Sequence, residues 1–141
     1  MIKDIYLLVG GEATRLRPLS EGIPKALLTI KGKLLIDLIL KNLDKSNLEN
    51  INLICSIKHE KFWLEYKKNS QFNVNLHFEP EKLDTAGFVV QNINNFSDKF
   101  LCMNGDLLIE MDFNSFLEVA NSSKNSTICS IPVHDPSRYG V

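Results

Sequence analysis

An apolar run at residues 5–9 ends at two consecutive glycines, and this junction constrains the fold of the chain more than any other feature. A short β-branched and aliphatic run that stops at a glycine pair predicts a buried strand followed by a sharp turn. Gly10 and Gly11 carry no Cβ, so the backbone can approach a ligand closely and turn successive N–H groups into one concavity. Such a concavity binds phosphate oxygens.

Basic side chains follow the glycine pair. Arg15, Arg17 and Lys25 lie within the next 14 positions, and residues 1–33 hold six Lys and Arg against three Asp and Glu, although the net charge of the chain is -1. Arginine can bind phosphate through two parallel hydrogen bonds, and lysine acts as a mobile point charge. The loop is therefore predicted to bind a polyphosphate.

The spacing of the loop matches neither GxxxxGK[ST] nor GxGxxG. Residues 10–20 followed by Pro24-Lys25 instead resemble the signature of the sugar-1-phosphate nucleotidyltransferases, also called nucleotide-sugar pyrophosphorylases. That signature is Gly-Gly-x-Gly-Thr-Arg-Leu-x-Pro-Leu-(Thr/Ser), then Pro-Lys. Ala13 stands in place of the third glycine, which is a mild change because a methyl group can still fit the turn.

Composition excludes several classes of protein. With 141 residues, 44% apolar and 23% charged, the chain is long enough for one ordinary domain with a core and is unlike a disordered chain. The net charge of -1 argues against binding to nucleic acid or to an anionic membrane through bulk charge. No apolar run has the length of a membrane helix and no signal peptide precedes the first strand, so a cytoplasmic protein is expected.

The three cysteines and the periodicity of the chain predict a reduced α/β protein. Cys55, Cys102 and Cys129 are widely spaced in apolar runs, which favours buried free thiols over disulfides or a metal cluster. Strands are predicted at 5–9, 51–57, 74–78, 100–103 and 127–133, a short extended segment at 26–30, and helices at 34–45, 58–69, 88–96 and 112–122.

Continuous apolar strands that alternate with helices predict an α/β fold: a Rossmann-like three-layer sandwich with a mostly parallel central sheet. Ligands of such sheets bind at the carboxyl ends of the strands. The loop after the first strand, the segment 79–87 and Asp106 are therefore expected to meet. The resemblance implies that residues 1–141 form a nucleotidyltransferase-like nucleotide-binding domain, truncated relative to the full catalytic domain of the family.

Asp106 is the candidate metal ligand. Its carboxylate ends the segment Asn104-Gly105-Asp106 after a strand, where one oxygen can hold Mg²⁺ while the ion keeps waters and phosphate oxygens as its other ligands. A plain turn is the alternative, because all three residue types favour turns. The resemblance favours the metal role, since the aspartate of the family's Asn-Gly-Asp segment binds the catalytic metal.

Two further segments resemble substrate-binding parts of the family. Residues 79–87 resemble its base-recognition segment, Glu or Gln followed shortly by Leu-Gly-Thr-Ala-Gly, except that Asp84 replaces the first glycine and can narrow the base pocket. Residues 135–141 resemble a segment whose Tyr-Gly pair, here Tyr139 and Gly140, lines the sugar site. The nucleotide-binding residues implied by the resemblance are Val9, Gly10, Gly11, Ala13, Thr14, Arg15, Glu79, Asp84 and Gly87.

The resemblance implies nucleotidyl transfer from a nucleoside triphosphate to a sugar 1-phosphate, which yields an NDP-sugar and pyrophosphate. The attacking phosphate oxygen is already an anion, so no general base is needed, and catalysis depends on positioning and charge neutralisation. Arg15 is expected to hold the triphosphate, Lys25 to bridge toward the α-phosphate or the sugar phosphate, and Asp106 to carry Mg²⁺.

Glu79 offers only acceptors when ionised, which suits the amino and imino donors of guanine. The Leu-Val-Gly-Gly opening resembles that of mannose 1-phosphate guanylyltransferases, and this resemblance favours GTP and mannose 1-phosphate over UTP or dTTP and glucose 1-phosphate. Family catalytic domains are longer and include a second metal-binding Asp, so this chain is expected to bind nucleotide but to turn over slowly or not at all.

Two other functions remain open. The first is a non-catalytic module that senses a nucleotide or an NDP-sugar on the same fold; loss of the loop cations would favour it, but Arg15 and Lys25 are present. The second is a glycosyltransferase, which predicts an Asp-x-Asp metal motif where this chain has a single carboxylate, that of Asp106. The sequence leaves the oligomeric state undetermined.

Overall fold

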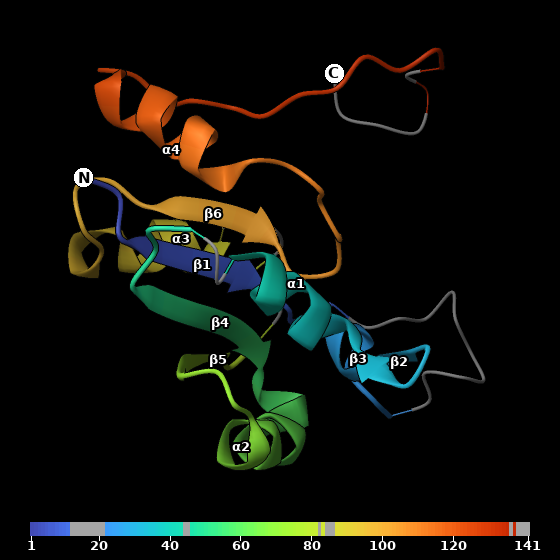
Figure 1. Ribbon diagram of the computed structural model, residues 1–141. Helices are drawn as coiled ribbons and strands as arrows, with labels where there is room; N and C mark the ends of the chain where they lie inside the picture. The colour runs from blue at the N-terminus through green and yellow to red at the C-terminus, as the bar shows by residue number, and fades with distance from the viewer. Residues whose placement is uncertain (12–21, 44–45, 82, 84–86, 136, 138–141) are drawn as a thin grey trace.

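The computed structural model describes residues 1–11, 22–43, 46–81, 83, 87–135 and 137. Its centre is a four-stranded parallel sheet with the strand order β5-β4-β1-β6 (Figure 1). The strands are β1 (Asp4–Leu8), β4 (Asn50–Ser56), β5 (Val74–Glu79) and β6 (Leu101–Asn104). The predicted parallel sheet is therefore confirmed, with the first strand inside the sheet and β6 at one edge.

Helices cover both faces of this sheet, as the continuous apolar strands predict (Figure 1). On one face, Ile5 and Leu7 of β1 pack against α1 (Leu35–Leu43), α2 (Glu60–Asn69) and α4 (Phe113–Ser122). On the other face, Tyr6 packs with Phe88 of α3 (Gly87–Asn92). The alternation along β1 follows the two-residue period of a strand.

The predicted helices are confirmed with shifted ends. Asp112 caps α4, because its side chain accepts hydrogen bonds from the N–H groups of Asn114 and Ser115. The predicted helix at 88–96 divides into α3 and a 3₁₀ turn at Ile93–Asn95. The aromatic residues of α2 differ in burial: Trp63 and Tyr66 are buried, whereas Phe62 keeps 42% of its surface exposed.

The predicted extended segment at 26–30 is replaced by two short elements. A 3₁₀ turn at Lys25–Leu27 precedes β2 (Thr29–Ile30), which pairs antiparallel with β3 (Lys33–Leu34). The two residues between these strands have positive φ, 50° at Lys31 and 78° at Gly32. Positive φ at both positions is typical of the tight type I′ hairpin turn.

The predicted strand at 127–133 is wrong. The segment has no regular secondary structure, and Ile128 and Ile131 are 85% and 77% exposed. Apolar and β-branched residues form a strand only beside another strand, and no described strand pairs with this segment.

The prediction of buried thiols is also wrong for two of the three cysteines. Cys55 is buried, whereas Cys102 and Cys129 are exposed, and all three are free. Cys102 pairs in register with Tyr6 at the sheet edge, on the face where the short α3 covers β1 and β4. Cys129 lies in the segment that forms no strand.

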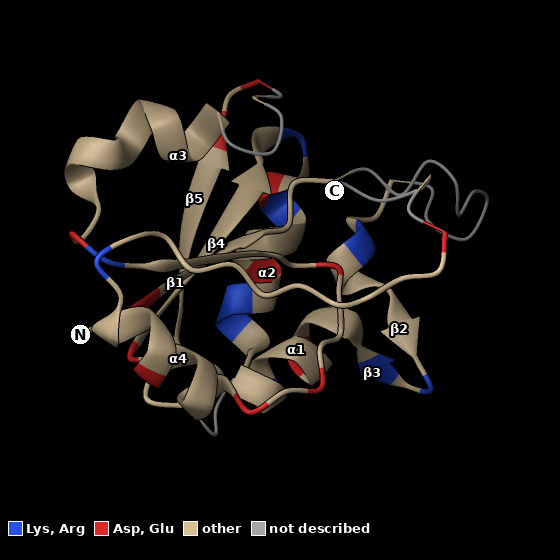
Figure 2. Cartoon of the chain, turned by 90° about the horizontal axis from the view of Figure 1, so that it is seen from above, with Lys and Arg blue, Asp and Glu red and all other residues tan. Residues whose placement is uncertain are grey.

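Charged residues of both signs alternate around the described chain and gather on no single side (Figure 2). None of the helices in the described ranges has the length and apolar character that crossing a bilayer requires.

Candidate active site at the strand ends

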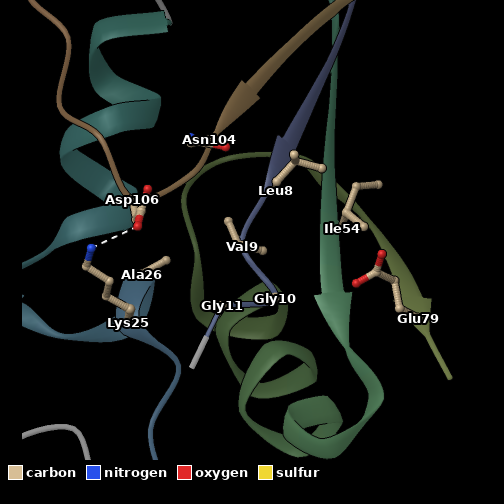
Figure 3. Close-up of a pocket in the computed structure, with 10 residues that line it drawn as sticks. All are labelled: Leu8, Val9, Gly10, Gly11, Lys25, Ala26, Ile54, Glu79, Asn104 and Asp106. Atoms are coloured by element: carbon tan, nitrogen blue, oxygen red, sulfur yellow. Dashed lines mark hydrogen bonds and ion pairs between the residues drawn. The ribbon is translucent and has the colours of Figure 1, made fainter. Parts of the chain in front are cut away.

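A cavity of about 300 Å³ opens at the carboxyl ends of β1, β4, β5 and β6 (Figure 3). It brings together the loop after β1, the end of β5 and the turn after β6, the meeting that the parallel sheet predicts. Its lining residues are Leu8, Val9, Gly10, Gly11, Lys25, Ala26, Ile54, Glu79, Asn104 and Asp106.

The glycine turn after β1 is held by its neighbours. The N–H of Val9 donates to the carbonyl oxygen of Ile54 at 3.0 Å, which extends the pairing of β1 with β4 by one residue. A Cβ on Gly10 would lie 3.3 Å from Oε2 of Glu79 and 3.4 Å from the backbone nitrogen of Ser56. A Cβ on Gly11 would meet no atom of the described residues within 4 Å. The two glycines therefore face different surroundings.

Gly105 fixes the turn that carries Asp106. Its N–H donates to the carbonyl oxygen of Leu8 at 2.9 Å, and a Cβ at this position would overlap Cγ1 of Val9. Only glycine lets the turn after β6 pack directly on the end of β1. This close packing places Asn104 and Asp106 beside the β1 loop.

Lys25 and Asp106 form an ion pair on one side of the cavity. Nζ of Lys25 lies 2.8 Å from Oδ2 of Asp106, and the two side chains are 36% and 39% exposed (Figure 3). Lys25 begins the 3₁₀ turn that follows the buried Pro24. The pair joins residues 81 positions apart in the sequence.

Glu79 lies on the opposite side of the same cavity, beyond Gly10 and Ile54 (Figure 3). Partial burial raises the pKa of its carboxyl group above the ordinary value. Within the described ranges, the Glu79 side chain has no hydrogen bond or ion pair. A half-buried carboxylate without a partner is available to accept hydrogen bonds from a ligand.

The donor set on the Asp106 side suits one Mg²⁺ ion. The described residues contain no cluster of three or more His, Cys, Asp or Glu that could hold a metal by themselves. A single carboxylate is nevertheless a common protein contribution to a Mg²⁺ site, because the ion keeps waters and substrate phosphate oxygens. The Lys25 ammonium already places one positive charge against Asp106, so this position accommodates a cation.

Most of the predicted site residues that lie in the described part of the chain line this cavity. Six predicted residues line the cavity: Val9, Gly10, Gly11, Lys25, Glu79 and Asp106. Gly87 does not line it; this residue begins α3, and its N–H donates to the carbonyl oxygen of Leu83. The remaining predicted residues lie outside the described part of the chain: Ala13, Thr14, Arg15, Asp84, Tyr139 and Gly140.

Four lining residues were not predicted: Leu8, Ala26, Ile54 and Asn104. Asn104 belongs to the segment Asn104-Gly105-Asp106, so its position two residues before Asp106 could have predicted that it lines the cavity. Leu8 and Ile54 lie near the ends of strands. The sequence does not distinguish an apolar strand residue that lines a cavity from one that packs in the core.

Comparisons with known proteins agree with this geometry. A family model described as nucleotidyl transferase matches residues 5–141. A putative mannose-1-phosphate guanyltransferase of Sulfolobus acidocaldarius is 40% identical over 139 residues, which cover 96% of this chain and 39% of that protein. The bifunctional protein GlmU of Methanococcus aeolicus is 32% identical over 139 residues, covering 98% of this chain and 32% of that protein.

A solved structure shares the fold. HddC from Yersinia pseudotuberculosis, complexed with GMP-PN, has a TM-score of 0.74 and 29% sequence identity. The match covers 86% of this chain and 55% of that one. The present chain therefore spans only part of the length of the proteins that it matches.

Proposed function

This chain belongs to the nucleotidyl transferase family, and from that premise we propose that its cavity binds a nucleoside triphosphate for nucleotidyl transfer to a sugar 1-phosphate. The products are an NDP-sugar and pyrophosphate. The whole reaction is part of the proposal, because this chain spans only 39% of the length of the relative that is 40% identical to it.

One observation carries the proposal: the cavity has two chemically different ends. Lys25 and Asp106 stand at one end, and Glu79, which has no hydrogen bond or ion pair with a described residue, stands at the other (Figure 3). A lysine beside a carboxylate that can hold Mg²⁺ suits the phosphates of a triphosphate. An unpaired acceptor suits the hydrogen-bond donors of a base. A nucleotide laid across the strand ends satisfies both ends at once.

The chain's own residues then act by position and charge. Lys25 binds the α-phosphate or the phosphate of the sugar, and Arg15 holds the triphosphate. Asp106 would hold Mg²⁺, which supplies charge neutralisation at the phosphates. The sugar phosphate is an anion at neutral pH and attacks phosphorus without a general base, so positioning and electrostatic stabilisation supply the rate enhancement. Tyr139 and Gly140 are proposed to line the sugar site.

The base is proposed to be guanine. An ionised carboxylate offers two acceptor oxygens and no donor. The Watson–Crick edge of guanine carries an imino N–H and an amino group side by side, whereas the edges of adenine, cytosine and uracil place an acceptor beside each donor. Glu79 therefore favours GTP over UTP or dTTP. The 40% identical relative is named for mannose 1-phosphate and guanylyl transfer, which supports mannose 1-phosphate as the acceptor.

The test is calorimetric titration of the 141-residue chain with GTP, ATP, UTP and dTTP in the presence of Mg²⁺. We expect GTP to bind most tightly, and Arg15→Ala and Asp106→Asn to weaken that binding. Lys33→Met is a matched control for loss of charge, because Lys33 is exposed on the β2–β3 hairpin and does not line the cavity. Absence of binding for every triphosphate contradicts the proposal.

Turnover separates this proposal from the alternative of a nucleotide-sensing module. With mannose 1-phosphate added, we expect slow release of pyrophosphate by the 141-residue chain. Pyrophosphate release that depends on mannose 1-phosphate supports this proposal and contradicts the sensing module.

A further inference from the structure

Gly10 and Gly11 of the β1 loop have different neighbours, although the sequence predicts the same phosphate-binding turn for both. A Cβ on Gly10 would point at Glu79, at 3.3 Å from Oε2, which is closer than ordinary van der Waals contact. The same atom on Gly11 would have no described residue within 4 Å. No positive φ is recorded at either glycine, so backbone strain does not explain the choice of residue at position 10.

We propose that Gly10 is the positioning residue for base selection: by lacking a side chain, it leaves the space in which the Glu79 carboxylate stands to bind guanine. This inference rests on the proposed function. Gly11 is left free to approach the phosphates, so the two adjacent glycines serve opposite ends of one nucleotide.

Packing against Gly10 determines where the Glu79 carboxylate lies. Glu79 is the last residue of β5 and pairs in register with Ser56 of β4, so its backbone is fixed by the sheet. Its carboxylate has no hydrogen bond or ion pair with a described residue that could hold it in another place. A Cβ at position 10 therefore requires a shift of a few tenths of an ångström, and the end of the Glu79 side chain moves more easily than the paired backbone of β4.

A small displacement matters because recognition of guanine uses both carboxylate oxygens. Two parallel hydrogen bonds to a carboxylate require both oxygens to face the donors in one plane. A methyl or isopropyl group beside Oε2 shifts this oxygen or covers it. The hydrogen bond from the imino N–H of guanine to Oε1 of Glu79 can then remain, while the hydrogen bond from the 2-amino group to Oε2 is lost.

The probe is the affinity ratio of GTP to ITP, which differ only in the 2-amino group. One hydrogen bond to a charged acceptor predicts a preference for GTP of about tenfold to a hundredfold in the unmodified chain. Gly10→Ala should reduce this ratio and Gly10→Val should bring it within about threefold of unity. Gly11→Ala and Gly11→Val are the matched variants and should leave the ratio unchanged, whatever they do to the affinity for both nucleotides.

A double-mutant cycle tests whether Gly10 acts through Glu79. Glu79→Ala should itself abolish the preference for GTP over ITP, and adding Gly10→Val to that background should change the ratio no further. The Glu79→Ala background also removes the closest contact of the added side chain, so the double variant is expected to fold, as checked by its thermal denaturation.

Each outcome decides the inference. An unchanged ratio in Gly10→Val, or equal losses in the Gly10 and Gly11 variants, overturns the role of Gly10 while GTP binding by the unmodified chain still supports the proposed function. Absence of triphosphate binding by the unmodified chain overturns both.

Discussion

Nζ of Lys25 lies 2.8 Å from Oδ2 of Asp106, so the two groups proposed to act on the triphosphate neutralise one another in the nucleotide-free chain. A metal ion that binds Oδ2 of Asp106 has to displace the ammonium group, and one that binds Oδ1 lies close to the same positive charge. The displaced ammonium is then free to bind a phosphate oxygen. In the proposed function, the ion pair therefore couples metal binding to phosphate binding through one carboxylate.

Lys25→Met is expected to raise the affinity of the nucleotide-free chain for Mn²⁺ by about two- to fivefold, since an exposed ion pair contributes up to about 1 kcal/mol. The measurement is the enhancement of water-proton relaxation by bound Mn²⁺. Lys33→Met removes the same charge away from the cavity and should leave the affinity unchanged. Equal or weaker Mn²⁺ binding by Lys25→Met contradicts the coupling, and Asp106→Asn should abolish the signal in either background.

Glu79→Gln is expected to raise the melting temperature at pH 7. Partial burial raises the pKa of Glu79 above its ordinary value of 4.5, so the native state binds a proton more readily than the unfolded state does. Ionisation of Glu79 therefore costs stability, and the cost disappears as the pH falls through the raised pKa toward 4.5 and below. Thermal denaturation at pH 7 and pH 4 should show a gain for the variant at pH 7 that is lost at pH 4. A less stable variant at pH 7 contradicts this account.

Gly105→Ala is expected to lower the free energy of unfolding by about 1–3 kcal/mol, because the added Cβ overlaps Cγ1 of Val9 in a closely packed turn. Urea denaturation measures the change. Gly11→Ala is the control for adding a methyl group to a glycine of the same cavity. It should change stability by less than about 0.5 kcal/mol, because no atom of the described residues lies within 4 Å of the new Cβ. Equal effects of the two substitutions contradict the packing argument.

Alkylation should separate the three thiols. Cys102 and Cys129 are exposed and should react with iodoacetamide in the folded chain, whereas Cys55 is buried and its raised pKa keeps the thiol protonated. Partial desolvation of the Cys102 thiol raises its pKa, which should slow its reaction. Mass spectrometry of tryptic peptides follows each site. Rapid reaction of Cys55 without unfolding contradicts the described core.

The sheet and the cavity could be predicted because each depends on local patterns. Continuous apolar runs mark the buried strands, and the glycine pair after β1 and the Asn-Gly-Asp turn after β6 mark two strand ends. Parallel topology then brings these ends together. The strand predicted at 127–133 failed because strand formation depends on a neighbouring strand, which a local pattern does not reveal.

Contacts between distant residues could not be predicted. The Lys25–Asp106 pair depends on how the 3₁₀ turn packs against the turn after β6, 81 residues further along the chain. The different surroundings of Gly10 and Gly11 depend on where the β5 side chain of Glu79 points. The ion pair and the surroundings of the two glycines both result from tertiary packing, which the local sequence does not encode.

A crystal structure of the chain with GTP and Mg²⁺ tests the central claim most directly, because it shows which way the nucleotide lies across the strand ends. The account predicts guanine within hydrogen-bond distance of the Glu79 carboxylate, phosphates beside Lys25, and the metal on Asp106 in place of the Lys25 ammonium. A nucleotide bound in the opposite direction, or bound away from this cavity, would contradict it.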